Sequence, residues 1–125
     1  MAYEVIGFKT GTLVAGANLS ALQYTFVKLN TAGAVVAASA SGEKVIGVLQ
    51  NKPTSGQVCE IVHLGLCPVK AGAAIASTGT IMTNASGAAI ASATTGSTIV
   101  GYACETAAAA NEIITAFVNC GVGVV

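Results

Sequence analysis

The chain has 125 residues, enough for one domain that buries a core without disulfides or a metal. It contains five Lys, five Glu and neither Arg nor Asp, so its formal net charge is zero and only 8% of its residues are charged. Nucleic-acid binding requires clustered basic residues, and these lysines stand singly along the chain, so we expect no nucleic-acid partner and a surface that adheres to other proteins.

The first element in chain order is the segment 1–12, which carries Tyr3, Val5, Ile6 and Phe8. This segment is either an arm that pairs with a neighbouring protein or the ordinary first strand of the domain. The sequence leaves both alternatives open. We take these four side chains as the candidate interaction residues.

The rest of the chain alternates between short runs rich in Val, Ile, Thr and aromatic residues and clusters of Gly, Asn, Ser and Thr. This alternation is typical of an all-β domain. The expected strands are residues 4–8, 24–29, 45–49, 58–64, 67–70, 80–83, 99–103 and 112–118. Two segments of helical composition, 19–23 and 106–110, are too short for stable helices, so we predict loops there.

An internal repeat organises these elements. Residues 30–47 align without a gap with residues 84–101, and the same offset carries the strand at 58–64 onto the strand at 112–118. In both copies an Asn is followed three positions later by a Gly, a pattern that predicts tight turns because Gly adopts positive φ readily.

The repeat predicts the fold class: all-β, a compact β-sandwich or barrel built from two quasi-repeated β units. The units cover about 13–64 and 69–118, inside a single domain at 13–125. Neither unit can bury its apolar face alone, so the two are expected to close on each other.

Titratable side chains are too few for a catalytic site. His63 is the only natural general base near neutral pH. Cys59 shares its strand face, but four residues of extended chain separate the two by about 13 Å, too far for a catalytic dyad within one strand. The aligned position in the second copy is Phe117, which favours a packing role for His63. We therefore predict no catalytic residues and no enzyme activity.

Metal and cofactor sites are not expected either. The spacing of the cysteines matches no zinc or redox motif. They are Cys59, Cys67, Cys104 and Cys120. We interpret them as buried free thiols, the alternative being a bond formed after release into an oxidising medium. The stretch 69–72 around Lys70 invites comparison with biotinyl and lipoyl carrier domains, in which a Lys lies at the tip of a hairpin between two quasi-repeats. The residues that flank Lys70 differ from theirs.

Two segments bear on membranes and export. The uncharged stretch 71–104 is long enough to span a membrane, but Gly, Ser, Thr and Asn interrupt it throughout, so no membrane partner is expected. Residues 1–20 lack the apolar core of a secretory signal. We therefore expect the protein to be made and used without export.

The chain resembles a known family over about residues 13–120. The matching segments are residues 69–82, 84–87, 98–105, 106–110 and 112–118. In this order they are similar to the capsid decoration, or cement, proteins of phages. The chain departs from that family in having four cysteines, and in residues 77–80, where the family often has Gly-Asp.

The resemblance implies a β-rich protomer that is made in the host cytoplasm and forms homotrimers on the outer surface of an icosahedral head. There it would clamp neighbouring copies of the major capsid protein and stabilise the capsid. Two alternatives stay open: another virion module, such as a tail, spike or baseplate part, or a small β-clip binding or carrier domain.

Overall fold

The computed structural model describes residues 8–10, 12–76, 78–92 and 96–120, and within them the chain forms strands and no helix. The nine strands are β1 (Phe8–Thr10), β2 (Phe26–Leu29), β3 (Val35–Ala37), β4 (Gly47–Leu49), β5 (Ile61–Lys70), β6 (Thr80–Thr83), β7 (Ala89–Ala91), β8 (Gly101–Ala103) and β9 (Ile113–Asn119). The all-β prediction is confirmed.

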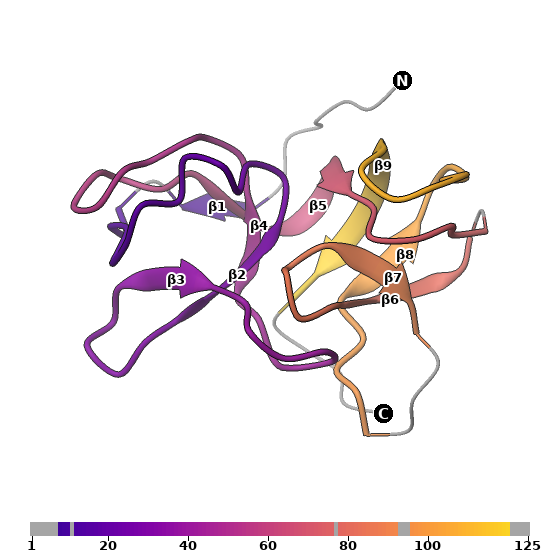
Figure 1. Cartoon of the computed structure of the whole chain (residues 1–125), viewed down its shortest axis with the longest axis horizontal. Helices are drawn as coiled ribbons and strands as arrows, with labels where there is room; N and C mark the ends of the chain where they lie inside the picture. The colour runs from indigo at the N-terminus through magenta and orange to yellow at the C-terminus, as the bar shows by residue number, and fades with distance from the viewer. Residues whose placement is uncertain (1–7, 11, 77, 93–95, 121–125) are drawn as a thin grey trace.

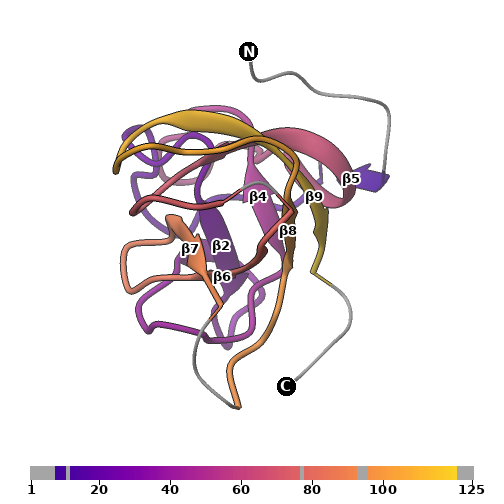
Figure 2. The ribbon, with the colours of Figure 1, turned by 90° about the vertical axis from the view of Figure 1, so that its right-hand side faces the viewer.

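All nine strands belong to one antiparallel, curled sheet. Its order is β3-β2-β4-β5-β9-β8-β6-β7, and β1 pairs with β5 outside this path. The two long strands β5 and β9 lie at the centre and pair over seven residues each, from Leu64 opposite Asn119 to Lys70 opposite Ile113. Figure 1 shows β1 to β4 on one side of this pair and β6 to β8 on the other, and Figure 2 shows how strongly β5 and β9 curve.

The two halves of the sheet have equivalent strand orders when each is followed from its outer edge to the centre. β3-β2-β4-β5 forms one half and β7-β6-β8-β9 the other, and the residues that pair β2 with β3 correspond one by one to those that pair β6 with β7. We call residues 8–64 the first unit and residues 65–120 the second unit. β5 is shared, because its first residues pair with β1 and β4 of the first unit and the rest pair with β9.

Both predicted turns are present and closely alike. The Oδ1 atom of Asn30 accepts hydrogen bonds from the second and fourth N–H groups that follow it, at 2.9 and 3.0 Å, and that of Asn84 does the same at 2.8 and 3.0 Å. Gly33 and Gly87 close these turns, both at φ +83°. An Asn side chain that holds the turn and a Gly with positive φ thus explain the pattern.

Three strand predictions need correction. The segments that form β3 and β7 were expected to be connections, because their Ala- and Ser-rich neighbourhoods have low β propensity. Pairing of β3 with β2 and of β7 with β6 overrides that preference. The two strands expected at 58–64 and 67–70 are one strand, β5. Gly65 lies inside it with φ +136°, so this glycine continues the strand and does not end it.

The two units also differ by one residue in a loop. The loop from Pro53 to Gly56 in the first unit corresponds to the loop from Ala107 to Asn111 in the second, which has one residue more. Matching backbone hydrogen bonds flank both loops, and both end at a positive φ, +84° at Gly56 and +73° at Asn111.

This extra residue changes the counterpart of His63. Val62 pairs with the middle residue of β4, and Phe117 pairs with the middle residue of β8, so these two are equivalent. The counterpart of His63 is therefore the next residue, Val118, and the sequence alignment onto Phe117 was wrong by one position. Val118 is fully buried in the core.

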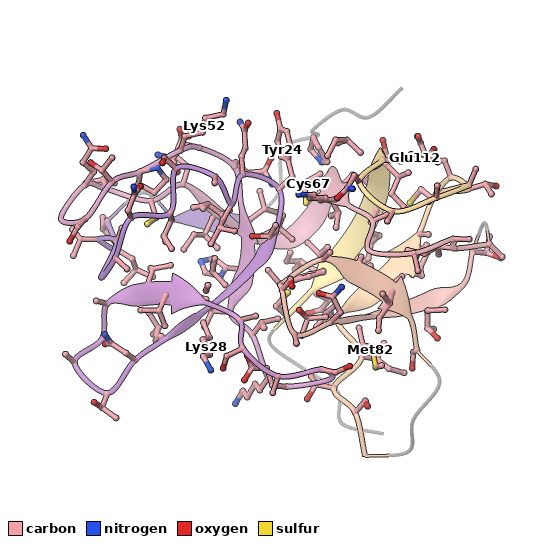
Figure 3. The ribbon with its side chains drawn as sticks, in the orientation of Figure 1. Tyr24, Lys28, Lys52, Cys67, Met82 and Glu112 are labelled. Atoms are coloured by element: carbon pink, nitrogen blue, oxygen red, sulfur yellow. The ribbon has the colours of Figure 1, made fainter. Side chains whose placement is uncertain are left out.

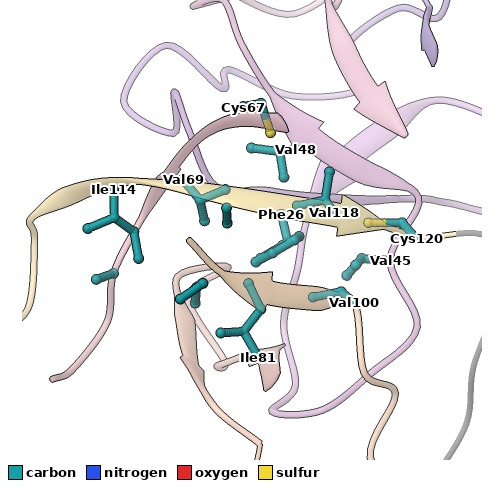
Figure 4. Close-up of a cluster of buried hydrophobic side chains, with 14 of the residues drawn as sticks. Phe26, Val45, Val48, Cys67, Val69, Ile81, Val100, Ile114, Val118 and Cys120 are labelled. Carbon is teal, nitrogen blue, oxygen red and sulfur yellow. The ribbon is translucent and has the colours of Figure 1, made fainter. Parts of the chain in front are cut away.

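Buried side chains form two clusters. One lies inside the first unit and contains Leu19, Leu49 and Ile61. The other is larger and joins the interior of the second unit to Phe26 and to neighbouring strands of the first. Figure 4 shows Phe26 and Val48 of the first unit among residues of the second. The contact between the units is therefore also the core of the second unit.

Candidate interaction surface

His63 has a structural partner. Its Nδ1 atom lies 2.7 Å from the backbone carbonyl oxygen of Ile46, and its side chain is half-buried. Cys59 is fully buried in the core of the first unit. Across the described ranges, no group of three or more His, Cys, Asp or Glu side chains is placed to hold a metal ion.

The four cysteines are free thiols in the structure, and three of them are buried. Burial raises the pKa of Cys59, and it raises the pKa of Cys120 to about 12. Because the thiolate is the reactive form, these two thiols are poor nucleophiles at neutral pH. Cys104 alone of the four is exposed, which corrects the expectation that all are buried.

Charged side chains are spread over the surface. Lys28 and Glu43 form an ion pair at 3.0 Å. Partial burial raises the pKa of the Glu43 carboxyl, but hydrogen bonds from the backbone of Ser39 and from Lys28 outweigh it and hold this pKa below its ordinary value. Figure 3 shows Lys28 and Lys52 on opposite sides of the first unit. Among the described residues there is no helix long and apolar enough to cross a membrane.

Lys70 does not occupy the tip of a hairpin. It is the last residue of β5, it pairs with Ile113, and its backbone N–H donates to the carbonyl oxygen of Tyr24. Its side chain is half-buried and lines a small cleft between the two units with Asn84 and Asn111. A carrier domain requires its lysine on an exposed turn, so this geometry counts against the carrier alternative.

The predicted interaction residues lie at the start of the chain. Phe8 belongs to β1 and is paired with Leu64 of β5. Tyr3, Val5 and Ile6 lie outside the described residues. Their role in interaction stays a prediction.

An exposed aromatic pair marks a surface that the sequence did not single out. Tyr102 of β8 and Phe117 of β9 are cross-strand neighbours, with stacked rings whose centroids are 5.4 Å apart and whose planes differ by 21°. Tyr102 is 44% exposed, and Phe117 is half-buried. Thr80 of β6 pairs with Tyr102 and is exposed as well. The signal in the sequence was two aromatic residues in a chain that has only six.

Further large apolar side chains are exposed elsewhere. Val14 and Val58 form a bridge and are 42% and 48% exposed, and Leu29 is 41% exposed. Exposed apolar area on a chain with few charges indicates protein interfaces. The described surface therefore offers apolar contact area.

Comparisons with known proteins agree with this description. A family model described as phage cement protein matches residues 9–120. Among solved structures, the N base of the head fiber gp8.5 of bacteriophage phi29 is similar, with a TM-score of 0.71 and 17% sequence identity over 90% of this chain and 95% of that one. At this identity the likeness shows a shared fold. No curated protein matches the chain.

Proposed function

The chain belongs to the phage cement protein family and is a structural protein of the virion, and from this premise we propose that it decorates the outer surface of an icosahedral phage head. In this role it bridges neighbouring copies of the major capsid protein and stabilises the shell. Binding requires complementary surface and no chemistry, so neither a cofactor nor a metal takes part.

The observation that carries the proposal is the composition of the surface. The protein is neutral, and it exposes Val14, Leu29, Val58, Tyr102 and Ile113 by 38% to 48% each. Isolated apolar side chains on a surface are ordinary, but here they accompany a low content of charge that favours association. A protein that remains attached to a capsid covers such residues.

The N-terminal segment is the part that we propose to contact the capsid. Within the described residues, β1 is paired on one edge, with β5, so its other edge offers free backbone groups to a neighbouring strand. Tyr3, Val5 and Ile6 precede β1 and supply apolar side chains for the same contact. Self-association into a homotrimer is the second part of the proposal.

Heads prepared without this protein provide the test. We expect the purified protein to co-sediment with them until a fixed number of sites is filled, and the filled heads to resist heat better than bare heads. Protein that stays in the supernatant at every concentration would contradict the proposal.

A pair of variants tests the role of the N-terminal segment. Val5→Ser together with Ile6→Ser should weaken head binding by about tenfold or more, because each apolar side chain buried in a contact contributes about 1.5–3 kcal/mol. Ser55→Ala changes an exposed side chain in the loop after Pro53 and should leave binding unchanged. Equal binding by all three proteins would exclude this segment from the contact.

The structural comparison favours a second candidate function. The similar protein is the base of a head fiber, so this chain is alternatively the anchor of a projecting fibre. Cryo-electron microscopy of the particle separates the two candidates: a fibre anchor carries additional protein that extends outward from it, and a cement protein does not.

A further inference from the structure

The two units touch through two different faces. The first unit contributes Phe26, Val48 and Val62, neighbours across β2, β4 and β5 that are at most 2% exposed; we call this trio the docking face. The second unit contributes the turn and loops around Thr83, Gly87 and Thr98, which we call the receiving face.

Backbone hydrogen bonds join the first unit to the receiving face. The N–H of Phe26 donates to the carbonyl oxygen of Gly87 at 2.7 Å. The N–H of Gly42 donates to the carbonyl oxygen of Thr83 at 2.8 Å, and the N–H of Thr98 donates to that of Gly42 at 3.0 Å. Because each unit presents a different face, the contact is head-to-tail, and one copy of each face is left over.

The unused docking face is that of the second unit. Thr80, Tyr102 and Phe117 occupy the same places in β6, β8 and β9 as the docking face does in β2, β4 and β5, with the same cross-strand pairing. They are exposed or half-buried, whereas the trio of the first unit is buried. Tyr102 is 44% exposed, with its ring stacked on that of Phe117.

The unused receiving face is that of the first unit. The counterparts of Thr83, Gly87 and Thr98 are Leu29, Gly33 and Lys44. All three are exposed, whereas Thr83, Gly87 and Thr98 are buried. Beside them lies an open hollow, and its lining includes Leu13, Leu29, Ile46 and His63.

We propose that Tyr102 and Phe117 of one copy dock onto the face around Leu29 and Lys44 of a second copy of this chain. A second copy of the chain is the expected partner, because the internal contact shows that one unit of this fold covers the docking face of another. This inference rests on the self-association proposed above and names its surfaces. A head-to-tail contact closes into a ring when the rotation between copies allows it.

The contact between copies uses the same faces with a different fit. Lys44 stands where the second unit has Thr98, and Tyr102 stands where the first unit has Val48. A lysine beside an aromatic ring is favourable through the cation–π interaction. These larger and partly charged residues are suited to a contact that forms after folding, in water, and not within the core.

Two single variants and their mixture test the proposal. We expect the wild type to be an oligomer by analytical ultracentrifugation, and both Tyr102→Glu and Leu29→Glu to be monomers. In an equal mixture, the intact Leu29 face of the first variant meets the intact Tyr102 face of the second, so dimers form that grow no further. The matched control is Val58→Glu, which should assemble as the wild type does.

Three results would overturn the inference: a monomeric wild type, a Leu29→Glu protein that assembles normally, or a mixture that stays monomeric. Circular dichroism shows whether each variant is folded, and Tyr102→Ser replaces any Tyr102→Glu protein that is not. The sedimentation test with heads is separate. A wild-type oligomer that does not bind heads contradicts the proposed attachment to the head and leaves this inference intact. A monomer that binds heads contradicts this inference and the proposed homotrimer, and leaves the proposed attachment intact.

Discussion

The two units place their core residues at the same positions but fill them differently. In the first unit these are Ala15, Leu19, Val27, Val35, Leu49, Cys59 and Ile61. In the second they are Ala71, Ile75, Ile81, Ala89, Ala103, Ile114 and Ala116. Three large side chains of the first unit thus have alanine as their counterpart. Phe26, Val48 and Val62 of the first unit belong to the same cluster as these alanines.

This difference teaches how a duplicated unit becomes one domain. The first unit has a core of its own, whereas the second depends on side chains that the first supplies. Close packing makes such a shared core cooperative, because a cavity in it affects both units. Because the contact between the units uses only one docking face and one receiving face, each of these faces occurs once buried and once exposed.

Phe26 and Thr80 test this comparison with the largest expected effect. They are counterparts, and Phe26 is fully buried whereas Thr80 is exposed. Phe26→Ala should lower the free energy of unfolding by about 3–5 kcal/mol, because it opens a cavity where the units meet. Thr80→Ala should change it by less than about 0.5 kcal/mol. Urea titration measures both, and similar values for the two would refute the shared core.

Leu49 and Ala103 test the difference in core filling. Leu49→Ala should cost about 2–5 kcal/mol, and Ala103→Leu should cost about 1–3 kcal/mol through overpacking. The two residues lie in separate clusters. The costs should therefore add in the double variant, and chemical unfolding of all three proteins checks this. A double variant as stable as the wild type would show that the two cores are one.

Gly33 and Gly87 sharpen the comparison at the turns, where both have φ +83°. Alanine at either position would have to adopt the left-handed conformation, which costs about 1–2 kcal/mol. A Cβ on Gly87 would also lie 2.8 Å from the carbonyl oxygen of Phe26, whereas one on Gly33 would meet nothing within 4 Å. Gly87→Ala should therefore cost about 1–3 kcal/mol more than Gly33→Ala in denaturant unfolding. Equal costs would mean that the turn is not pressed against the first unit.

Glu43 tests the smallest difference, since the second unit has Ser97 in its place. Its carboxylate accepts hydrogen bonds from Ser39, Ala40 and Lys28. Because the folded-state pKa is lowered, this group stabilises the protein above its ordinary pKa of 4.5, and the contribution is lost as the pH falls through the folded-state value. Glu43→Gln should cost less than about 1 kcal/mol at pH 7 and nothing at pH 2. Thermal unfolding at both pH values checks this, and a cost that persists at pH 2 would contradict it.

The features that the sequence predicted are local ones. The turns at Asn30 and Asn84 follow from an Asn that accepts backbone hydrogen bonds and a Gly that takes positive φ, and both act within a few residues. The strands β3 and β7 were missed because their pairing depends on distant partners. Gly65 was taken as the end of a strand, since a sequence does not show whether a glycine continues or breaks one.

The candidate surface was harder to predict than the fold. The repeat makes the faces of Val48 and Tyr102 equivalent, and only the packing of the two units shows that one is covered and the other exposed. The extra residue before Asn111 also shifted the alignment of the last strand, which paired His63 with Phe117. A single sequence offers no means of placing such an insertion within an alanine run.

Cryo-electron microscopy of the parent phage head tests the central claim most directly, because it shows both the site of attachment and the neighbours of each copy. We expect the protein on the outer surface, at contacts between major capsid subunits, with Tyr102 and Phe117 covered by the Leu29 face of an adjacent copy. A head whose outer surface lacks this protein, or one on which Tyr102 faces solvent in every copy, would contradict the account.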